Sequence, residues 1–372
     1  MERKQLMRLV IPSVLVIIVS IITMKYSPSE TLVPLPSPVS NLNNLTNSKG
    51  VEIIAQGLHA PRAVDVSKDG RIFFTEKSGI IRVIENGNLL KDPIGDIKVE
   101  NIGDAGLLGL ALHPNFTQNH IFYVYYTYSN NTGLFNRVLM LQESNNKIID
   151  SKTIIESIPG GEYRDGGRIK FGPDGKLYVS TGDASIPGLS QDLDSLAGKI
   201  LRVNDDGTIP LDNPFSNSSV YAYGFRNAQG LAWNVSSGDL YVPDQGAAGN
   251  DEINLVNPGG NYGWPYEECN SNGEKSSPLL CFNPSLEPSG LIVPASDKLG
   301  YKGHLIVATL KGSHLREINF ETGSQSTILV GYGRIVDVVE SHDGSIVVLT
   351  SNTDGRGLPQ KDDDKILRLT RS

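Results

Sequence analysis

Four short segments of the chain carry charged or amide side chains next to glycine. Three of them contain cations: Arg226 with Asn227 in GFRNAQG, Lys311 in ATLKG and Arg334 in YGRIVD. A cation beside a glycine is commonly a solvated charge in a turn, but guanidinium and ammonium groups also bind carboxylates. The fourth segment, DQGAAGNDEIN at residues 244–254, offers backbone carbonyls and carboxylates. Such hard oxygen ligands suit Ca²⁺ and not a soft metal.

A repeated β-hairpin must position these segments. From Val51 onward an apolar strand, a turn such as Asp-Gly and a second apolar strand recur. The six copies are found at residues 63–76, 108–126, 168–183, 230–246, 298–312 and 338–352. Alternating Val, Ile, Leu, Tyr and Phe around the turns predicts antiparallel hairpins. Several copies are followed by another strand, as in IIRVIE, KILRVN, EINLVN and KILRLT.

Six such units predict an all-β fold, a six-bladed β-propeller of four-stranded antiparallel blades over residues 51–372. A single blade cannot bury both faces, so the ring must close, and residues 51–56 (VEIIAQ) are expected to pair with the last blade. The longer segments 184–200 and 261–297 are expected on one rim, where a propeller builds its site. A β-sandwich with insertions is the alternative.

Composition agrees with this interpretation. The 372 residues include 39 glycines and 21 prolines, as expected for many short strands and tight turns. The net charge of −8 argues against a general nucleic-acid-binding role, which needs a basic face.

The N-terminal part predicts export. Residues 1–25 contain an apolar run from Leu9 to Met24 after three basic residues, which predicts a signal-anchor or transmembrane helix with the rest of the chain outside the cytoplasm. The alternative is a cleaved signal peptide and a secreted protein. Residues 26–50 are rich in Pro, Ser and Asn and predict a linker. In an oxidising compartment, Cys269 and Cys281 are expected to form a local disulfide.

Four stretches together resemble the signature segments of the PQQ-dependent soluble aldose sugar dehydrogenases, the glucose/sorbosone dehydrogenase family. They are DGGRIKFGPDGKLYVSTGD, YGFRNAQGLAWN, DQGAAGNDEINLVNPGGNYGWP, and YGRIVDVVESHDG with the later DDDKILRL. The resemblance runs through nearly all of residues 51–372. It implies pyrroloquinoline quinone (PQQ) on one face of a six-bladed propeller, Ca²⁺ holding that cofactor, and a sugar above it.

The resemblance also implies roles for single residues. Arg226 and Asn227 match the family's pair that faces the quinone, and Lys311 matches its cofactor-binding lysine. Arg334 matches the first of two arginines that grip a cofactor carboxylate.

The resemblance to the family also implies a calcium site. The resemblance places Gln245 among the cofactor-binding residues, and the carbonyls of Gly246 and Ala247 after it match the two that hold the calcium ion. Asp251 and Glu252 are expected to support this loop or to bind a second, structural ion.

Three positions depart from the family. Arg164 stands where the family has its general-base histidine, and a guanidinium stays protonated and cannot abstract a proton. Asp104 replaces the cofactor-binding glutamine or glutamate before GLL, and Val336 replaces the second arginine. Asp165 and Asp104 are the nearest substitute bases, with pKa values expected to be lowered by neighbouring cations. Arg164 could instead bind a cofactor carboxylate and offset the arginine lost at Val336.

The function implied is PQQ- and Ca²⁺-dependent oxidation of an aldose at its anomeric carbon to the lactone, outside the cytoplasm. The partners would be a sugar substrate and a quinone or cytochrome electron acceptor. Loss of the base histidine keeps a non-catalytic, ligand-binding propeller open as an alternative. A calcium-dependent lactonase-like hydrolase on the same fold is a further one.

Overall fold

The computed structural model of the chain describes residues 50–269, 273 and 275–371. The predicted membrane segment, and the linker up to residue 49, lie outside these residues. Within them, no helix is both long enough and apolar enough to cross a membrane.

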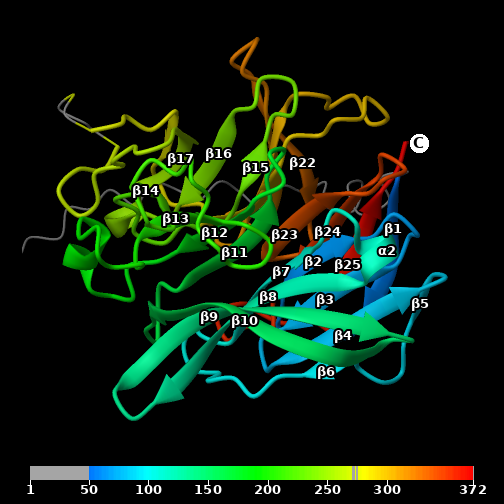
Figure 1. Ribbon diagram of the computed structural model, residues 1–372. Helices are drawn as coiled ribbons and strands as arrows, with labels where there is room; N and C mark the ends of the chain where they lie inside the picture. The colour runs from blue at the N-terminus through cyan, green and yellow to red at the C-terminus, as the bar shows by residue number, and fades with distance from the viewer. Residues whose placement is uncertain (1–49, 270–272, 274, 372) are drawn as a thin grey trace, which may run out of the picture. The chain divides into compact units, whose positions relative to one another are not determined.

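The described chain forms a six-bladed β-propeller (Figure 1). The first three blades contain, in chain order, β2 (Pro61–Val66), β3 (Ile72–Glu76), β4 (Ile80–Glu85), β5 (Asn88–Leu89) and β6 (Gly95–Asp96); then β7 (Leu107–Leu112), β8 (Ile121–Asn130), β9 (Gly133–Ser144) and β10 (Lys147–Pro159); then β11 (Gly166–Phe171), β12 (Leu177–Thr181), β13 (Lys199–Val203) and β14 (Val220–Tyr223). The last three contain β15 (Ala232–Trp233), β16 (Leu240–Asp244), β17 (Asp251–Val256) and β18 (Leu280–Phe282); then β19 (Pro288–Ile292), β20 (Leu305–Thr309), β21 (His314–Ile318) and β22 (Gln325–Val330); then β23 (Ile335–Glu340), β24 (Ile346–Thr350), β25 (Lys365–Leu369) and β1 (Val51–Gln56). Short helices α2 (Phe116–Asn119), η1 (Pro187–Ser190) and η2 (Ala247–Gly249) lie in the connections.

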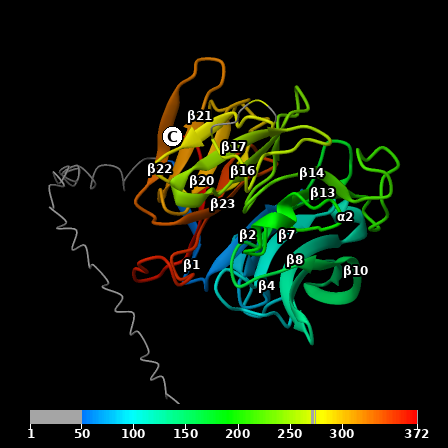
Figure 2. The ribbon, with the colours of Figure 1, turned by 90° about the vertical axis from the view of Figure 1, so that its left-hand side faces the viewer.

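The ring closes as predicted, because β1 pairs antiparallel with β25 and so joins the two ends of the described chain in one blade. The first strand of each hairpin is the inner strand, and β2 contacts β7 on one side and β23 on the other. Both ribbon views place β2, β7 and β23 together in the interior (Figures 1 and 2).

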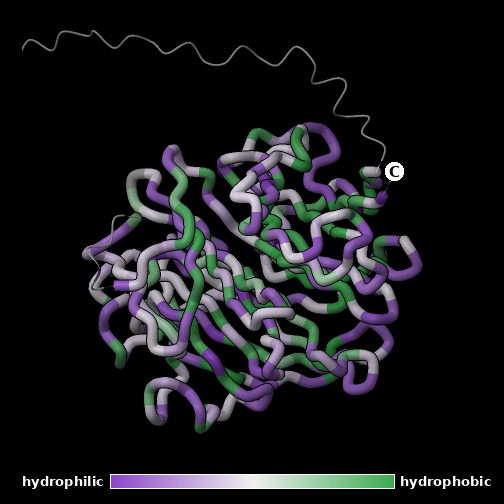
Figure 3. Tube along the Cα trace, turned by 90° about the horizontal axis from the view of Figure 1, so that it is seen from above, coloured by the Kyte–Doolittle hydropathy of each residue, from purple (hydrophilic) through white to green (hydrophobic). Residues whose placement is uncertain are grey.

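Apolar side chains fill the spaces between neighbouring blades. Six buried clusters each join two adjacent blades, so the described part of the ring is held by six interfaces instead of one central core. Figure 3 shows the hydrophobic stretches running through the interior and the hydrophilic ones mainly in the outer loops.

A buried arginine occupies the axis, where the inner strands converge. Arg168, on β11, is 7% exposed. Its guanidinium donates hydrogen bonds to one residue in each of the other five blades, namely to the carbonyls of Arg62, Leu108, Gln229 and Val336 and to the hydroxyl of Ser289. A single side chain therefore ties all six blades together.

The prediction was wrong about the fifth hairpin. Its first strand is β19, ahead of the sequence copy at residues 298–312, and it belongs to the segment 261–297 that was expected to be a rim loop. The signal was weak because β19 reads PSGLI, with a proline and a glycine that ordinarily disfavour a strand interior. The other five hairpins agree with the prediction.

Candidate active site

A polar cavity of about 480 Å³ opens at one end of the ring. Most of its walls come from the segments just before the inner strands and just after the second strands. The residues that line it are Asp104, Tyr163, Arg164, Ser185, Arg226, Asn227, Gln245, Gly246, Gly249, Asp251, Ser285, Glu287, Lys311 and Arg356. The structure thus brings together seven of the residues predicted from sequence: Asp104, Arg164, Arg226, Asn227, Gln245, Gly246 and Lys311. We refer to it as the polar cavity.

Arg226 is held rigidly but retains free hydrogen-bonding capacity. Its backbone N–H donates to Asp244 at 2.8 Å, and its Nη1 donates to the Gln245 carbonyl at 2.8 Å. The guanidinium lies over the Trp264 ring, 5.4 Å from the ring centre. Its Nε is enclosed and has no partner among the described residues. A buried donor without a partner is uncommon in folded proteins, which is consistent with a site that a ligand completes.

Asn227 is fixed by the same turn. Its backbone N–H donates to Asp244 at 2.6 Å, and its side-chain amide donates to Gln245 Oε1 at 2.8 Å. Burial, together with the nearby Glu252, raises the pKa of Asp244 to about 8. The buried carboxyl group of Asp244 therefore orients both Arg226 and Asn227 by accepting their backbone N–H groups.

Arg164 has the left-handed backbone conformation, with φ of 67°, at the start of the third blade. Its Nη1 forms an ion pair with Asp183 at 3.2 Å. The same Asp183 oxygen accepts a hydrogen bond from Trp264 Nε1 at 2.9 Å. Because Trp264 also contacts Arg226, the two arginines form one arrangement on this wall. Sequence reasoning missed Asp183 and Trp264, although both lie within the quoted motifs STGD and NYGWP.

The expectation for Asp165 needs correction. Its carboxylate does not line the polar cavity but accepts hydrogen bonds from Asn136 Nδ2 at 2.8 Å and from the Gly161 N–H at 3.0 Å. Its other oxygen is enclosed and has no hydrogen-bond partner in the part of the chain that the structure describes. Burial raises the pKa of Asp165 to about 6, whereas the sequence had suggested a lowered pKa. The adjacent position in the sequence did not reveal that the side chain turns toward the second blade.

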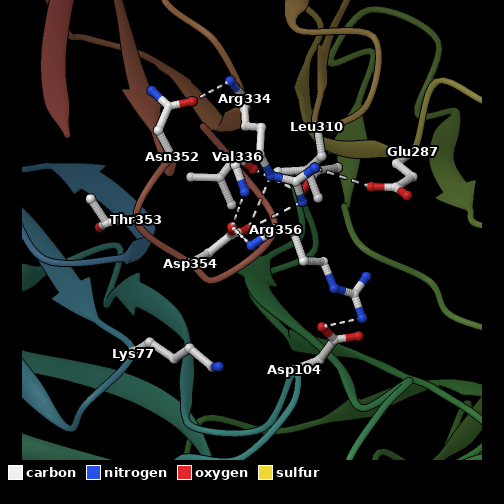
Figure 4. Close-up of polar contacts among 12 residues, drawn as sticks. Lys77, Asp104, Glu287, Leu310, Arg334, Val336, Asn352, Thr353, Asp354 and Arg356 are labelled. Carbon is white, nitrogen blue, oxygen red and sulfur yellow. Dashed lines mark hydrogen bonds and ion pairs between the residues drawn. The ribbon is translucent and has the colours of Figure 1, made fainter. Parts of the chain in front are cut away.

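Arg334 lies behind the cavity wall. Its guanidinium pairs with Asp354 at 3.1 Å and with Glu287 at 3.5 Å (Figure 4). Glu287 lines the cavity, whereas Arg334 does not. In this structure Arg334 is thus already engaged by two carboxylates of the chain.

Arg356 is a cavity residue that the sequence did not single out. Its guanidinium pairs with Asp104 at 2.8 Å (Figure 4). It also lies over the Tyr163 ring, 5.6 Å from the ring centre. The only signal was its position in the segment TSNTDGRG, which ends four residues before DDDKILRL. Lys311, by contrast, lines the cavity with no hydrogen bond or ion pair from its side chain to any described residue.

Of the two residues predicted to hold calcium through their carbonyls, Gly246 lines the cavity and Ala247 does not. Ala247 begins η2, where its carbonyl accepts the Asn250 N–H at 3.0 Å. The Asp251 carboxylate is occupied by four donors: Gly246 N, Ser285 Oγ, Leu286 N and Glu287 N. This favours the loop-supporting role for Asp251 over binding of a second ion.

The predicted disulfide is confirmed. Cys269 and Cys281 are bonded, with their Cα atoms 5.7 Å apart. A carboxylate oxygen of Glu252 lies within 4.8 Å of both sulfur atoms. Since both sulfurs are in the disulfide, they are not available as thiolate ligands. Glu252 instead accepts the Cys269 N–H at 2.7 Å and so anchors the same loop.

Comparison with known proteins agrees with these features. The family model described as glucose/sorbosone dehydrogenase matches residues 58–367. The chain belongs to the glucose/sorbosone dehydrogenase family. It is 30% identical to the aldose sugar dehydrogenase YliI of Escherichia coli, over 87% of this chain and 96% of that protein.

Two further family members are informative. Quinoprotein glucose dehydrogenase B of Acinetobacter calcoaceticus is 33% identical over 58% of this chain and 52% of its own length. The solved PQQ-bound form of the aldose sugar dehydrogenase of Streptomyces coelicolor is 34% identical and superimposes with a TM-score of 0.79, covering 87% of this chain and 97% of that one.

Proposed function

We propose that the protein is a PQQ- and Ca²⁺-dependent dehydrogenase that oxidises an aldose at its anomeric carbon to the lactone. The observation that carries the proposal is a polar cavity in which Arg226 and Lys311 keep donors with no partner among the described residues. A cavity of this size is within the range of small-molecule and cofactor sites. PQQ is the favoured ligand, because relatives in the same family are quinoproteins or have been solved with PQQ bound.

The hydrogen-bond donors of the polar cavity fit PQQ. PQQ carries three carboxylates and an ortho-quinone, and planar guanidinium groups bind carboxylates through two parallel hydrogen bonds. Arg226 and Asn227 would face the quinone, Lys311 and Arg164 would bind acidic groups, and Gln245 would hold Asn227 in place. When bound, PQQ would supply the two-electron acceptor for the sugar.

Calcium would be held by the carbonyls of Gly246 and Ala247, with Asp251 fixing the loop that carries them. The Ala247 carbonyl already accepts one hydrogen bond but has a second lone pair. Hard oxygen ligands of this kind suit Ca²⁺.

Proton removal from the sugar hydroxyl would fall to Asp104. Of the two substitute bases suggested by the sequence, Asp104 lines the polar cavity, while Asp165 points toward Asn136. The ion pair with Arg356 holds the Asp104 carboxylate in place. Arg164, a permanent cation, would orient the substrate or cofactor and not accept the proton.

A non-catalytic binding propeller is the second candidate, and the cation at position 164 is the observation that favours it. The propeller would act outside the cytoplasm, carried by the N-terminal segment as an anchor or exported by it as a signal. Electrons would pass to a quinone or cytochrome acceptor.

The test is reconstitution of the purified propeller, residues 50–372, with PQQ and Ca²⁺. A dehydrogenase is expected to show a bound-quinone absorption spectrum that aldoses bleach and that a chelator prevents from forming. Bound quinone that no aldose bleaches would support the binding module. Absence of any bound quinone would contradict both the cofactor assignment and the proposed activity.

A further inference from the structure

The inner strands of three blades share an irregularity at the same point. In the first blade, Arg62 is an extra residue between the pairs Pro61↔Glu76 and Ala63↔Thr75. In the sixth blade, Val336 is the extra residue between Ile335↔Thr350 and Asp337↔Leu349. Leu108 has this place in the second blade. A bulge of this kind re-aims the side chain of the extra residue.

The axial arginine shows that these positions correspond in space. The carbonyls of Arg62, Leu108 and Val336 all accept hydrogen bonds from the Arg168 guanidinium. The first and sixth blades are neighbours, since β2 contacts β23. Arg62 is therefore the counterpart of Val336 in the adjacent blade.

The surroundings of Arg62 are unusual for an arginine. The residue is 6% exposed, and its guanidinium makes no hydrogen bond or ion pair with any residue in the described ranges. Its Nε is fully enclosed. Like Arg334, Arg62 lies next to the polar cavity and is not part of its lining. Buried arginines are ordinarily paired, because an uncompensated buried charge is costly.

The carboxylates near Arg62 already have partners. Asp104 and Asp354 favour the charged form of Arg62 electrostatically. However, Asp104 pairs with Arg356 and Asp354 pairs with Arg334 (Figure 4). Lys77 adds another cation close by, and its Nζ donates to the Gly103 carbonyl. The region next to the polar cavity thus holds a surplus of positive charge around an unpartnered guanidinium.

We infer that Arg62 supplies the guanidinium that is missing at Val336 and binds a carboxylate of the cofactor from the neighbouring blade. This rests on the proposed function, since the acidic ligand is PQQ. It also explains why a buried cation without a partner is kept in the first blade. The assignment replaces Arg164 as the residue that offsets the lost arginine.

The test is the affinity of the apoprotein for PQQ in the presence of Ca²⁺, measured from quenching of protein fluorescence. Arg62→Leu is expected to weaken binding about ten- to a hundredfold, as for loss of a charge-assisted hydrogen-bonded pair. The double variant Arg62→Leu/Val336→Arg is expected to recover most of that loss. Arg82→Leu is the matched control, because Arg82 lies on the outer part of the same blade, and it should bind PQQ like the wild type.

Thermal unfolding of the apoproteins separates binding from folding. Removing an unpaired buried charge should leave the midpoint unchanged or raise it, whereas removing a structural arginine would lower it. Arg62→Gln is a second variant with a neutral polar side chain, measured in case the leucine variant does not fold.

Wild-type PQQ affinity in either folded Arg62 variant would overturn the inference, as would an equal loss in Arg82→Leu. If the wild type itself binds no PQQ, the proposed function fails and this inference falls with it. Tight binding by the wild type with no effect at Arg62 contradicts the inference alone.

Discussion

Arg168 and Arg164 lie four residues apart in the segment RDGGR, and their surroundings differ completely. Arg168 is buried on the axis and donates to four carbonyls and a hydroxyl from the five other blades. Arg164 lies at the polar cavity, where its side chain is 29% exposed and pairs with Asp183. The propeller thus uses one guanidinium to satisfy its own convergent carbonyls and leaves others with spare donors for a ligand.

The difference follows from geometry. At the axis, the bulged inner strands turn backbone carbonyls toward one point, and a planar five-donor group can satisfy them together. At the cavity, the segments leave the strands and diverge. Arg164 and Arg356 each form one ion pair there, and the Lys311 side chain has no partner among the described residues. Stability therefore depends on the first region and binding on the second.

The largest effect is expected from Arg168→Met. Loss of the axial guanidinium removes its hydrogen bonds to buried acceptors of five blades, of which the Val336 carbonyl keeps one from Ser289 Oγ. It also leaves Asp337 without its ion-pair partner. We expect the free energy of unfolding to fall by about 3–5 kcal/mol, in the range for breaking buried charge networks. Denaturant unfolding measures this. Arg164→Met is the control, with an expected loss of about 1 kcal/mol; equal losses would mean that the axial network has no special role.

A large effect on activity is expected from Arg164→His. The histidine would stand at the family's base position, and Asp183 is placed to hydrogen-bond the imidazole and orient it. A positioned general base contributes about 10²–10⁴-fold to rate. Turnover with an aldose in the reconstituted enzyme should rise accordingly. Asp183→Asn in the same background should remove most of the gain; an unchanged rate in Arg164→His would show that proton removal is already provided for.

Arg226→Ala is expected to act on turnover with little effect on the fold. The side chain is half-buried at the cavity, and its guanidinium donates one hydrogen bond to a described residue, the Gln245 carbonyl. Loss of a preorganised donor at a reacting group costs about 10²–10³-fold in turnover. The steady-state rate and the thermal midpoint, measured together, check this. Wild-type turnover in a folded variant would remove Arg226 from the site.

Most of the fold could be predicted from the sequence because its signals are local. Hairpins with turns such as Lys68-Asp69-Gly70 recur along the chain, and several are followed by a strand such as IIRVIE. Ring closure by residues 51–56 follows from the need to bury each blade on both sides. The fifth hairpin failed because β19 carries Pro288 and Gly290.

The site was harder to predict because its key contacts join blades that are distant in sequence. The motifs located Arg226, Asn227, Gln245, Gly246 and Lys311 at the cavity. No local pattern indicated that Arg356 would reach Asp104, 252 positions away in the chain, or that Asp165 would turn away from its neighbour Arg164. The correspondence between Arg62 and Val336 likewise becomes visible only when the bulges of different blades are compared.

The smallest effect is expected from Asp165→Asn, and it separates the two candidate bases. Because burial raises the pKa of Asp165 to about 6, the folded protein holds a proton that the unfolded chain releases between about pH 4 and pH 6. Stability therefore falls as the pH rises through this window, and above it the buried charge continues to destabilise the folded protein.

The Asp165→Asn variant keeps an oxygen that accepts hydrogen bonds from Asn136 and Gly161, and it removes that charge. The variant should be more stable than the wild type by up to about 3 kcal/mol at pH 7.5, and the difference should vanish near pH 4. Sugar oxidation should persist in Asp165→Asn and be lost in Asp104→Asn. The opposite pattern of activities would return the base to Asp165, and a stability difference independent of pH would mean that the Asp165 carboxyl group is not desolvated as the structure indicates.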